Sequence, residues 1–111
     1  MAKNDYFIIV YKILKYLYKC LKSSESISVS YLSCETKDFP VAQEYWEYII
    51  EHMIDDDLID GPNVCRSDTG FTMIKGFQNI RITPIGIEYL QENNMMKKAA
   101  DAIKDLASLI P

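Results

Sequence analysis

Apolar residues in the first fifth of the chain recur every three or four positions, which is the spacing of one face of an α-helix. The pattern predicts a helix from Asp5 to about Lys22. Its apolar residues form two adjoining faces, one with Phe7, Val10, Tyr11, Leu14, Leu17, Tyr18 and Leu21 and the other with Ile9, Ile13, Tyr16 and Cys20. Together the faces exceed the roughly 100° stripe of a helix with one core contact. We therefore expect this helix to contact its own core and also another helix or a second chain.

A second helix is predicted where Asp38 can act as N-cap and Pro40 can occupy the first turn. It extends to about Asp56, where a run of three aspartates opposes the helix dipole. Its expected buried side consists of Ala42, Tyr45, Trp46, Ile49, Ile50 and Met53. Its opposite side is an acidic stripe of Glu44, Glu47, Glu51 and Asp55, with Tyr48 beside it.

Two more helices are expected in the last third of the chain. Thr83 as N-cap and Pro84 at the first helical position predict a third helix, which ends at Asn93–Asn94. A last helix is predicted over about 95–110. Its apolar stripe consists of Met96, Ala99, Ile103, Leu106 and Ile110.

Short extended segments are expected between the helices. Residues 26–31 alternate between polar and apolar side chains, which is typical of a strand, although 31–34 also suits a helical turn. Turn-forming residues at 60–63 and 67–70 separate further extended segments. These segments are 58–59, 71–74 and 79–83, with Gly76 between the last two. They predict a β-hairpin of two or three short strands.

The expected order is helix, short strand or turn, helix, β-hairpin, helix, helix. This is the order of a winged helix-turn-helix with an added C-terminal helix, a mainly α fold with a small antiparallel β-hairpin (α+β). A length of 111 residues suits one domain over 1–111.

Two segments resemble known winged-helix sequences. Residues 49–61 (IIEHMIDDDLIDG) look like the end of the second motif helix running into the wing, and 82–93 (ITPIGIEYLQEN) resemble the strand-to-helix junction after it. With the opening 9–15 and a C-terminal helix over 97–106, the chain is similar to the YjcQ-like family, small winged-helix proteins of Gram-positive bacteria and their phages. The resemblance covers most of the chain. It implies a non-enzymatic regulator and offers no catalytic residues to carry over.

The composition is 49% hydrophobic and 25% charged, which is typical of a folded globular chain. No apolar run reaches the roughly 18 residues of a membrane span, and the polar start does not resemble a signal peptide. We therefore expect a cytoplasmic protein without membrane contact. Cys20, Cys34 and Cys65 are an odd set without Cys-x-x-Cys spacing, so no redox role is expected.

Residue patterns typical of enzymes are missing from the sequence. It has one histidine, His52, and lacks the phosphate-binding, dinucleotide-binding and serine-nucleophile motifs. His52, Asp55 and Asp56 share a helical face, but structural zinc sites take four Cys or His ligands. We expect no catalytic residues, no cofactor and no metal.

Charge is distributed unevenly along the chain. The formal net charge is −4, and residues 41–70 hold one Arg against eight acidic residues. The acidic stripe falls on the helix that a winged helix-turn-helix places in the DNA major groove. A carboxylate near a phosphate costs about 1 kcal/mol in water and up to about 4 kcal/mol near a protein surface. Docking of this helix in the major groove is therefore not expected.

Two functions remain. The first is a prophage- or phage-type regulator that acts in transcription through double-stranded DNA or a DNA-bound partner. Its candidate DNA contacts are Lys12, Lys15, Lys19 and Lys22 on the first helix, and Arg66, Lys75 and Arg81 on the hairpin. The second function is that of an acidic protein–protein interaction module. It would have the same winged-helix scaffold, act as a dimer or an adaptor, and not bind DNA. Its candidate partner contacts are Glu44, Glu47, Tyr48, Glu51 and Asp55. The first and last helices would then form a homodimer or partner surface, unless they cover each other within one chain.

Overall fold

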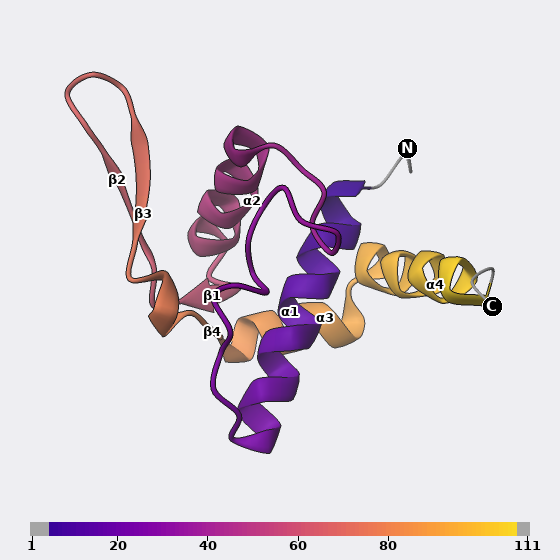
Figure 1. Ribbon diagram of the computed structural model, residues 1–111. Helices are drawn as coiled ribbons and strands as arrows, with labels where there is room; N and C mark the ends of the chain where they lie inside the picture. Colours follow the sequence, from indigo (N-terminus) through magenta and orange to yellow (C-terminus); the bar gives the residue numbers. More distant parts are fainter. Residues whose placement is uncertain (1–4, 109–111) are drawn as a thin grey trace.

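The first helix is the central element of the fold (Figure 1). The computed structural model describes residues 5–108, and the side chains of residues 5–104. The elements are α1 (Asp5–Ser23), α2 (Gln43–Asp55), β1 (Ile59–Asp60), β2 (Asn63–Arg66), β3 (Thr72–Lys75), a 3₁₀ turn η1 (Phe77–Asn79), β4 (Arg81–Ile82), α3 (Pro84–Glu92) and α4 (Asn94–Ser108). Because α1 packs against the other three helices and β4, it organises the core. The mainly α class with small antiparallel strand pairs (α+β) is confirmed.

The buried side of α1 takes residues from both predicted apolar faces. They are Ile9, Val10, Ile13, Leu14, Leu17 and Cys20. Leu21, predicted on the first face, is instead 53% exposed. It lies in the last turn, at the end of α1 that projects below the other elements in Figure 1. Elsewhere α4, α3 and β4 of the same chain pack against α1, so contacts within one chain account for its wide apolar arc.

The structure of the segment 24–42, between α1 and α2, differs from two of the predictions. The strand expected over 26–31 is wrong, because a turn closes there when the Leu32 N–H donates to the Ser28 carbonyl at 3.3 Å. The alternative, a short helical turn over 31–34, is also displaced, because the turn lies at 29–31. Asp38 is not the N-cap of α2, which begins at Gln43 after Ala42.

Burial of two side chains explains why the segment 24–42 takes this path. Leu32 and Phe39 are both fully buried in the core. The Phe39 ring packs against Trp46 and Tyr31, with centroid distances of 5.1 and 5.6 Å. The Thr36 hydroxyl also accepts the Phe39 N–H at 3.1 Å and holds the turn before it. Because Phe39 must reach the core, the chain cannot yet start the helix at Asp38.

The strands form two separate antiparallel pairs, β1 with β4 and β2 with β3. The β2–β3 hairpin is confirmed, and it projects from the body beside α2 (Figure 1). Its limits differ from prediction, because Asn63 begins β2 and Phe71 lies outside β3.

Only Arg81–Ile82 of the segment 79–83 form a strand. Gly61 lies against the start of this segment. Its φ is +105°, and a Cβ there would lie 2.1 Å from the Asn79 carbonyl oxygen. This close approach accompanies the 3₁₀ turn at 77–79, which replaces extended backbone.

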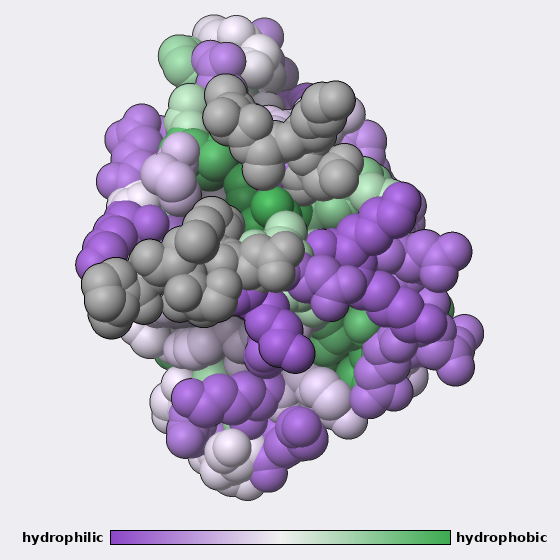
Figure 2. Space-filling view, turned by 90° about the vertical axis from the view of Figure 1, so that its right-hand side faces the viewer, coloured by the Kyte–Doolittle hydropathy of each residue, from purple (hydrophilic) through white to green (hydrophobic). Residues whose placement is uncertain are grey.

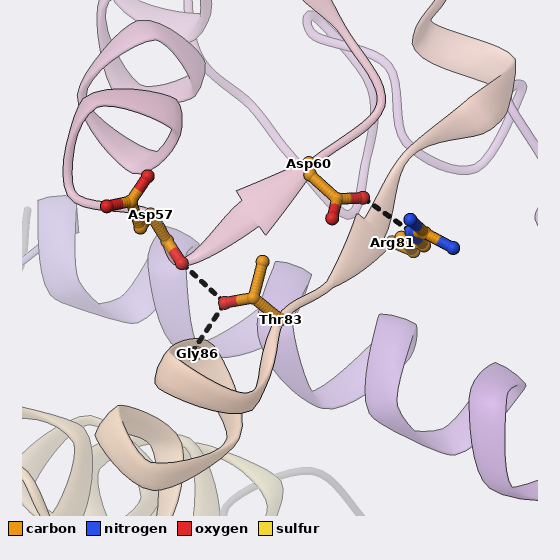
Figure 3. Close-up of polar contacts among 5 residues, drawn as sticks. All are labelled: Asp57, Asp60, Arg81, Thr83 and Gly86. Carbon is orange, nitrogen blue, oxygen red and sulfur yellow. Dashed lines mark hydrogen bonds and ion pairs between the residues drawn. The ribbon is translucent and has the colours of Figure 1, made fainter.

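Thr83 and Pro84 begin α3, as the sequence predicts. The Thr83 hydroxyl accepts the Gly86 N–H at 2.9 Å and donates to the Asp57 carbonyl (Figure 3). Gly86 lies so close to Leu58 that a Cβ would be 2.2 Å from its carbonyl oxygen. The Thr-Pro-x-Gly sequence thus joins the start of α3 to the chain that follows α2.

Asn93 ends α3 and caps α4, which begins one residue earlier than predicted. The Asn93 side-chain oxygen accepts the Met95 N–H at 2.8 Å. Met96 and Ala99 of the predicted stripe are buried, in the part of α4 nearest its start. The side chain of Leu106, and Ile110 as a whole, lie outside the described part of the chain.

The winged helix-turn-helix assignment stays a prediction. The β2–β3 hairpin occupies the position of a wing, between α2 and α3. The two helices of a helix-turn-helix are joined by a turn of about 3–4 residues. Here the whole segment 24–42 separates α1 from α2.

Candidate nucleic-acid interface

The four predicted lysines of α1 share a groove with α4. We call this hollow, of about 660 Å³, the lysine groove. It is lined by Lys12, Lys15, Lys19, Lys22 and Lys97, by Tyr11, Tyr16, Tyr18 and Tyr31, and by Leu90, Met96, Ala100 and Ile103. Figure 2 views this side of the molecule, and recessed hydrophobic patches lie there between projecting hydrophilic side chains. None of these lining residues is acidic, so positive charge predominates among the described residues that line the groove.

Two of the lysines lie on tyrosine rings. The Lys15 ammonium is 5.5 Å from the Tyr11 ring centroid, and the Lys22 ammonium is 4.3 Å from that of Tyr18. These are cation–π contacts, which contribute about 0.5–1 kcal/mol at exposed sites. Both lysines are exposed, so they can leave the rings for a stronger anionic ligand.

Lys12 differs from the other lysines. It is half-buried, its ammonium donates to the Asp38 carbonyl, and it lies 4.9 Å from the Phe39 ring centroid. Burial lowers the pKa of Lys12, and the nearby Asp38 charge partly opposes that shift. Lys12 therefore joins the segment 24–42 to α1 and is less available to a ligand than Lys15.

Tyr16 and Tyr31 form the side of the groove nearest the segment 24–42. Their ring centroids are 4.6 Å apart, and the Tyr16 hydroxyl accepts the Ser28 N–H at 2.8 Å. Burial raises the pKa of both phenols above the ordinary value for tyrosine. This side of the groove is fixed by packing and by a hydrogen bond.

The three hairpin cations that sequence analysis grouped as DNA contacts are not brought together in this way. Arg66 pairs with Glu51 of α2. The Arg81 Nε donates to Asp60 at 2.5 Å (Figure 3), and this hydrogen bond raises the pKa of Arg81. Lys75 is exposed at the end of β3. Because acidic partners neutralise both arginines, the hairpin has less positive charge available to bind a phosphate than the lysine groove has.

Most of the predicted partner contacts line a second groove, between α2 and the end of the hairpin. This acidic groove has a volume of about 700 Å³. It is lined by Ala42, Gln43, Glu44, Glu47, Tyr48, Glu51, Gly70, Phe71 and Thr72. Asp55 is not among these residues. Tyr48 is 53% exposed and Phe71 is 73% exposed, so the acidic groove combines carboxylates with exposed aromatic rings.

Three parts of these surfaces were not predicted from the sequence. Tyr11 and Tyr18 were assigned only to the apolar face of α1. Each tyrosine is followed four residues later by a lysine, and this spacing is the sequence signal for the two ring–ammonium contacts. Lys97 joins the groove only because α4 folds back onto α1, which no local pattern shows. Phe71 reaches the acidic groove only through the projecting hairpin.

The remaining candidates add no chemistry to these grooves. The His52 ring packs on Tyr48, with centroids 4.3 Å apart. Within the described side chains, His, Cys, Asp and Glu form no group of three or more that could hold a metal ion. Among the described helices, none combines the length and apolarity that a membrane crossing requires.

Comparison with known proteins identifies the family. No curated protein and no solved structure matches the chain. The family model described as YjcQ protein matches residues 11–109. This range extends from Tyr11 in α1 past the end of α4 and includes every lining residue of both grooves. Since the match covers far more than half of the sequence, the chain belongs to the YjcQ protein family.

Proposed function

We propose that this protein is a non-enzymatic, phage- or prophage-type regulator that acts in transcription by binding DNA through the lysine groove. The observation that supports this most is the gathering of five lysines from α1 and α4 around one hollow, whose lining within the described part of the chain contains no acidic residue. Positive charge on one face is what attracts the phosphates of a nucleic acid. The α2 face is the less suitable surface, because its carboxylates repel phosphates.

The strength of this contact follows from the number of available ammonium groups. Lys12 is held by Asp38 and Phe39, which leaves Lys15, Lys19, Lys22 and Lys97. Four phosphate contacts give a slope of about −3.6 for log K against log salt. Affinity therefore falls about 150-fold between 50 and 200 mM salt. The contact is a weak, sequence-independent one at physiological salt.

A titration of backbone-amide NMR signals with mixed-sequence duplex DNA at about 50 mM salt tests this proposal. Shifts concentrated along α1 and the start of α4 are expected, and they should shrink at 200 mM salt. Lys15→Gln with Lys19→Gln should weaken the response. Lys37→Gln with Lys98→Gln removes the same charge from two exposed lysines that do not line the groove and serves as the matched control. No shifts at high DNA concentration, or equal losses in both double variants, would refute binding through the lysine groove.

A second candidate function is a protein-interaction module that uses the acidic groove. It is favoured by the exposed Tyr48 and Phe71 beside Glu44 and Glu47, because a surface of this kind suits a basic partner with apolar side chains. Glu44→Lys with Glu47→Lys should abolish that contact and leave the fold intact. A purified partner that binds the double variant as well as the wild type would contradict this candidate.

A further inference from the structure

The lysine groove is built from a short repeat in α1. The pattern Tyr-Lys-x-Leu-Lys occurs at residues 11–15 and again at 18–22. Seven residues advance an α-helix by about 10.5 Å and return it to within about 20° of the same face. The two copies therefore lie one behind the other along the groove. Each copy contributes one tyrosine ring and two lysines to its lining.

Each repeat pairs a flat ring with an ammonium group. The lysine at the end of each copy lies over the tyrosine at its start, at 5.5 Å in the first and 4.3 Å in the second. Tyr11 and Tyr18 are partly buried and line the hollow. No side-chain hydrogen bond of either phenol occurs among the described residues, so the part that each tyrosine offers is its ring.

We propose that the lysine groove binds an unpaired strand of nucleic acid, with bases stacked on Tyr11 and Tyr18 and phosphates at the lysines. This inference rests on the proposed function, because it specifies the form of nucleic acid that the same lysines bind. Grooves that combine backbone-tracking positive charge with stacking aromatic rings are the general solution for single strands. Each of the two copies of the repeat supplies a tyrosine ring for stacking and two lysines for the phosphates.

The geometry favours an unpaired strand over a duplex. Bases in a duplex are stacked about 3.4 Å apart along each strand, so their faces are covered by their neighbours. A tyrosine can stack only on a base whose face is open, so the two rings, about 10.5 Å apart along α1, require bases that have separated from their neighbours. A duplex could reach the exposed lysines from outside, but the hollow of about 660 Å³ and both rings would stay unused.

Stacking of a base on Tyr11 or Tyr18 also requires the lysine ammonium group to move away from the ring. Lys15 and Lys22 are exposed and cover the ring faces through weak contacts. A base stacked on a tyrosine replaces that contact with a larger one, and the displaced ammonium is free to bind the adjacent phosphate. An acidic peptide would use the lysines in the same way but has no group that needs the two rings.

The experiment compares fluorescein-labelled oligo-dT, oligo-dU, oligo-U and a mixed-sequence duplex of equal length, by anisotropy at about 50 mM salt with the full chain. The single strands should bind at least about 10-fold more tightly than the duplex. Tyr11→Leu with Tyr18→Leu should weaken single-strand binding by about 25-fold or more and leave duplex binding unchanged. Tyr11→Phe with Tyr18→Phe keeps both rings and should retain binding. Oligo-dU has the same base as oligo-U, so the difference between these two strands shows which sugar the groove prefers.

Each alternative result has a distinct meaning. Equal affinity for duplex and single strand, with no effect of the leucine substitutions, overturns this inference and leaves the proposed function standing. Absence of binding to every nucleic acid overturns both. Displacement of oligo-dT by an equimolar poly-glutamate peptide overturns the inference in favour of a protein ligand. Should the leucine variant fail to fold, photo-cross-linking of a 5-iodouracil oligonucleotide to the wild type decides: adducts at Tyr11 or Tyr18 support the inference, and adducts only elsewhere overturn it.

Discussion

Replacing Thr83 with valine removes the hydroxyl that joins α3 to the end of α2 while keeping the branched shape of the side chain. The hydroxyl accepts the Gly86 N–H and donates to the Asp57 carbonyl. Loss of an N-cap costs about 1 kcal/mol, and loss of a second hydrogen bond about 0.5–1.5 kcal/mol. Because Thr83 is only partly buried, water replaces some of the second bond. The free energy of unfolding should therefore fall by about 1.5 kcal/mol.

Urea unfolding gives this difference directly. Trp46 is the single tryptophan and is 6% exposed, packed between Phe39 and Phe77, so its fluorescence reports loss of the core. Far-UV circular dichroism follows the helices in parallel. The midpoint should decrease with an unchanged slope, and Thr83→Ser should stay within about 0.5 kcal/mol of the wild type because it keeps the cap. The reasoning is refuted if valine has no effect, or if serine loses as much as valine.

Three further changes test other contacts. Gly86→Ala should lower the free energy of unfolding by more than about 2 kcal/mol, because its Cβ would lie 2.2 Å from the Leu58 carbonyl oxygen; a gain in urea stability, as alanine gives in an open helix, would contradict the close contact. Burial and then the hydrogen bond to Asp5 raise the pKa of Tyr45 to about 12, so its contribution to stability is complete below pH 10 and is lost as the pH rises toward 12. Tyr45→Phe should accordingly lose less stability than the wild type between pH 9 and 12 in urea titrations, and parallel curves would disprove the assignment. Arg81→Gln should leave the urea midpoint unchanged within error, since the Arg81–Asp60 pair is exposed to solvent; a clear decrease would show that the pair matters for the fold.

Local sequence signals were sufficient for some elements and insufficient for others. Thr83 with Pro84 specifies the start of α3 because cap and first turn are adjacent in sequence. The start of α2 was misassigned because Asp38 carries a valid local signal that the burial of Phe39 overrides. No pattern within 24–42 shows that Phe39 packs on Trp46. The path of that segment is set by tertiary packing.

The same distinction applies to the candidate site. The spacing of the α1 lysines places them on one strip of a helix, which sequence periodicity shows. Their groove also needs Lys97, and that residue arrives only through packing of α4 on α1. Likewise, Arg66 has no acidic neighbour in its own strand, and its pairing with Glu51 depends on how the hairpin sits beside α2. The sequence therefore shows where the basic residues are, but not which of them form an ion pair with an acidic side chain in the folded protein.

The packing of α4 on α1 has a consequence for how the chain is made. The two helices are separated by the 70 residues 24–93. At a synthesis rate of about 5–20 residues per second, α1 is complete about 4–14 seconds before the first residue of α4 is added. During this interval the surface of α1 against which Met96 later packs is exposed. Contacts of this surface with other apolar groups must be avoided until α4 is made. The burial of α1 is thus completed only after residues 24–93 and the start of α4 have been added.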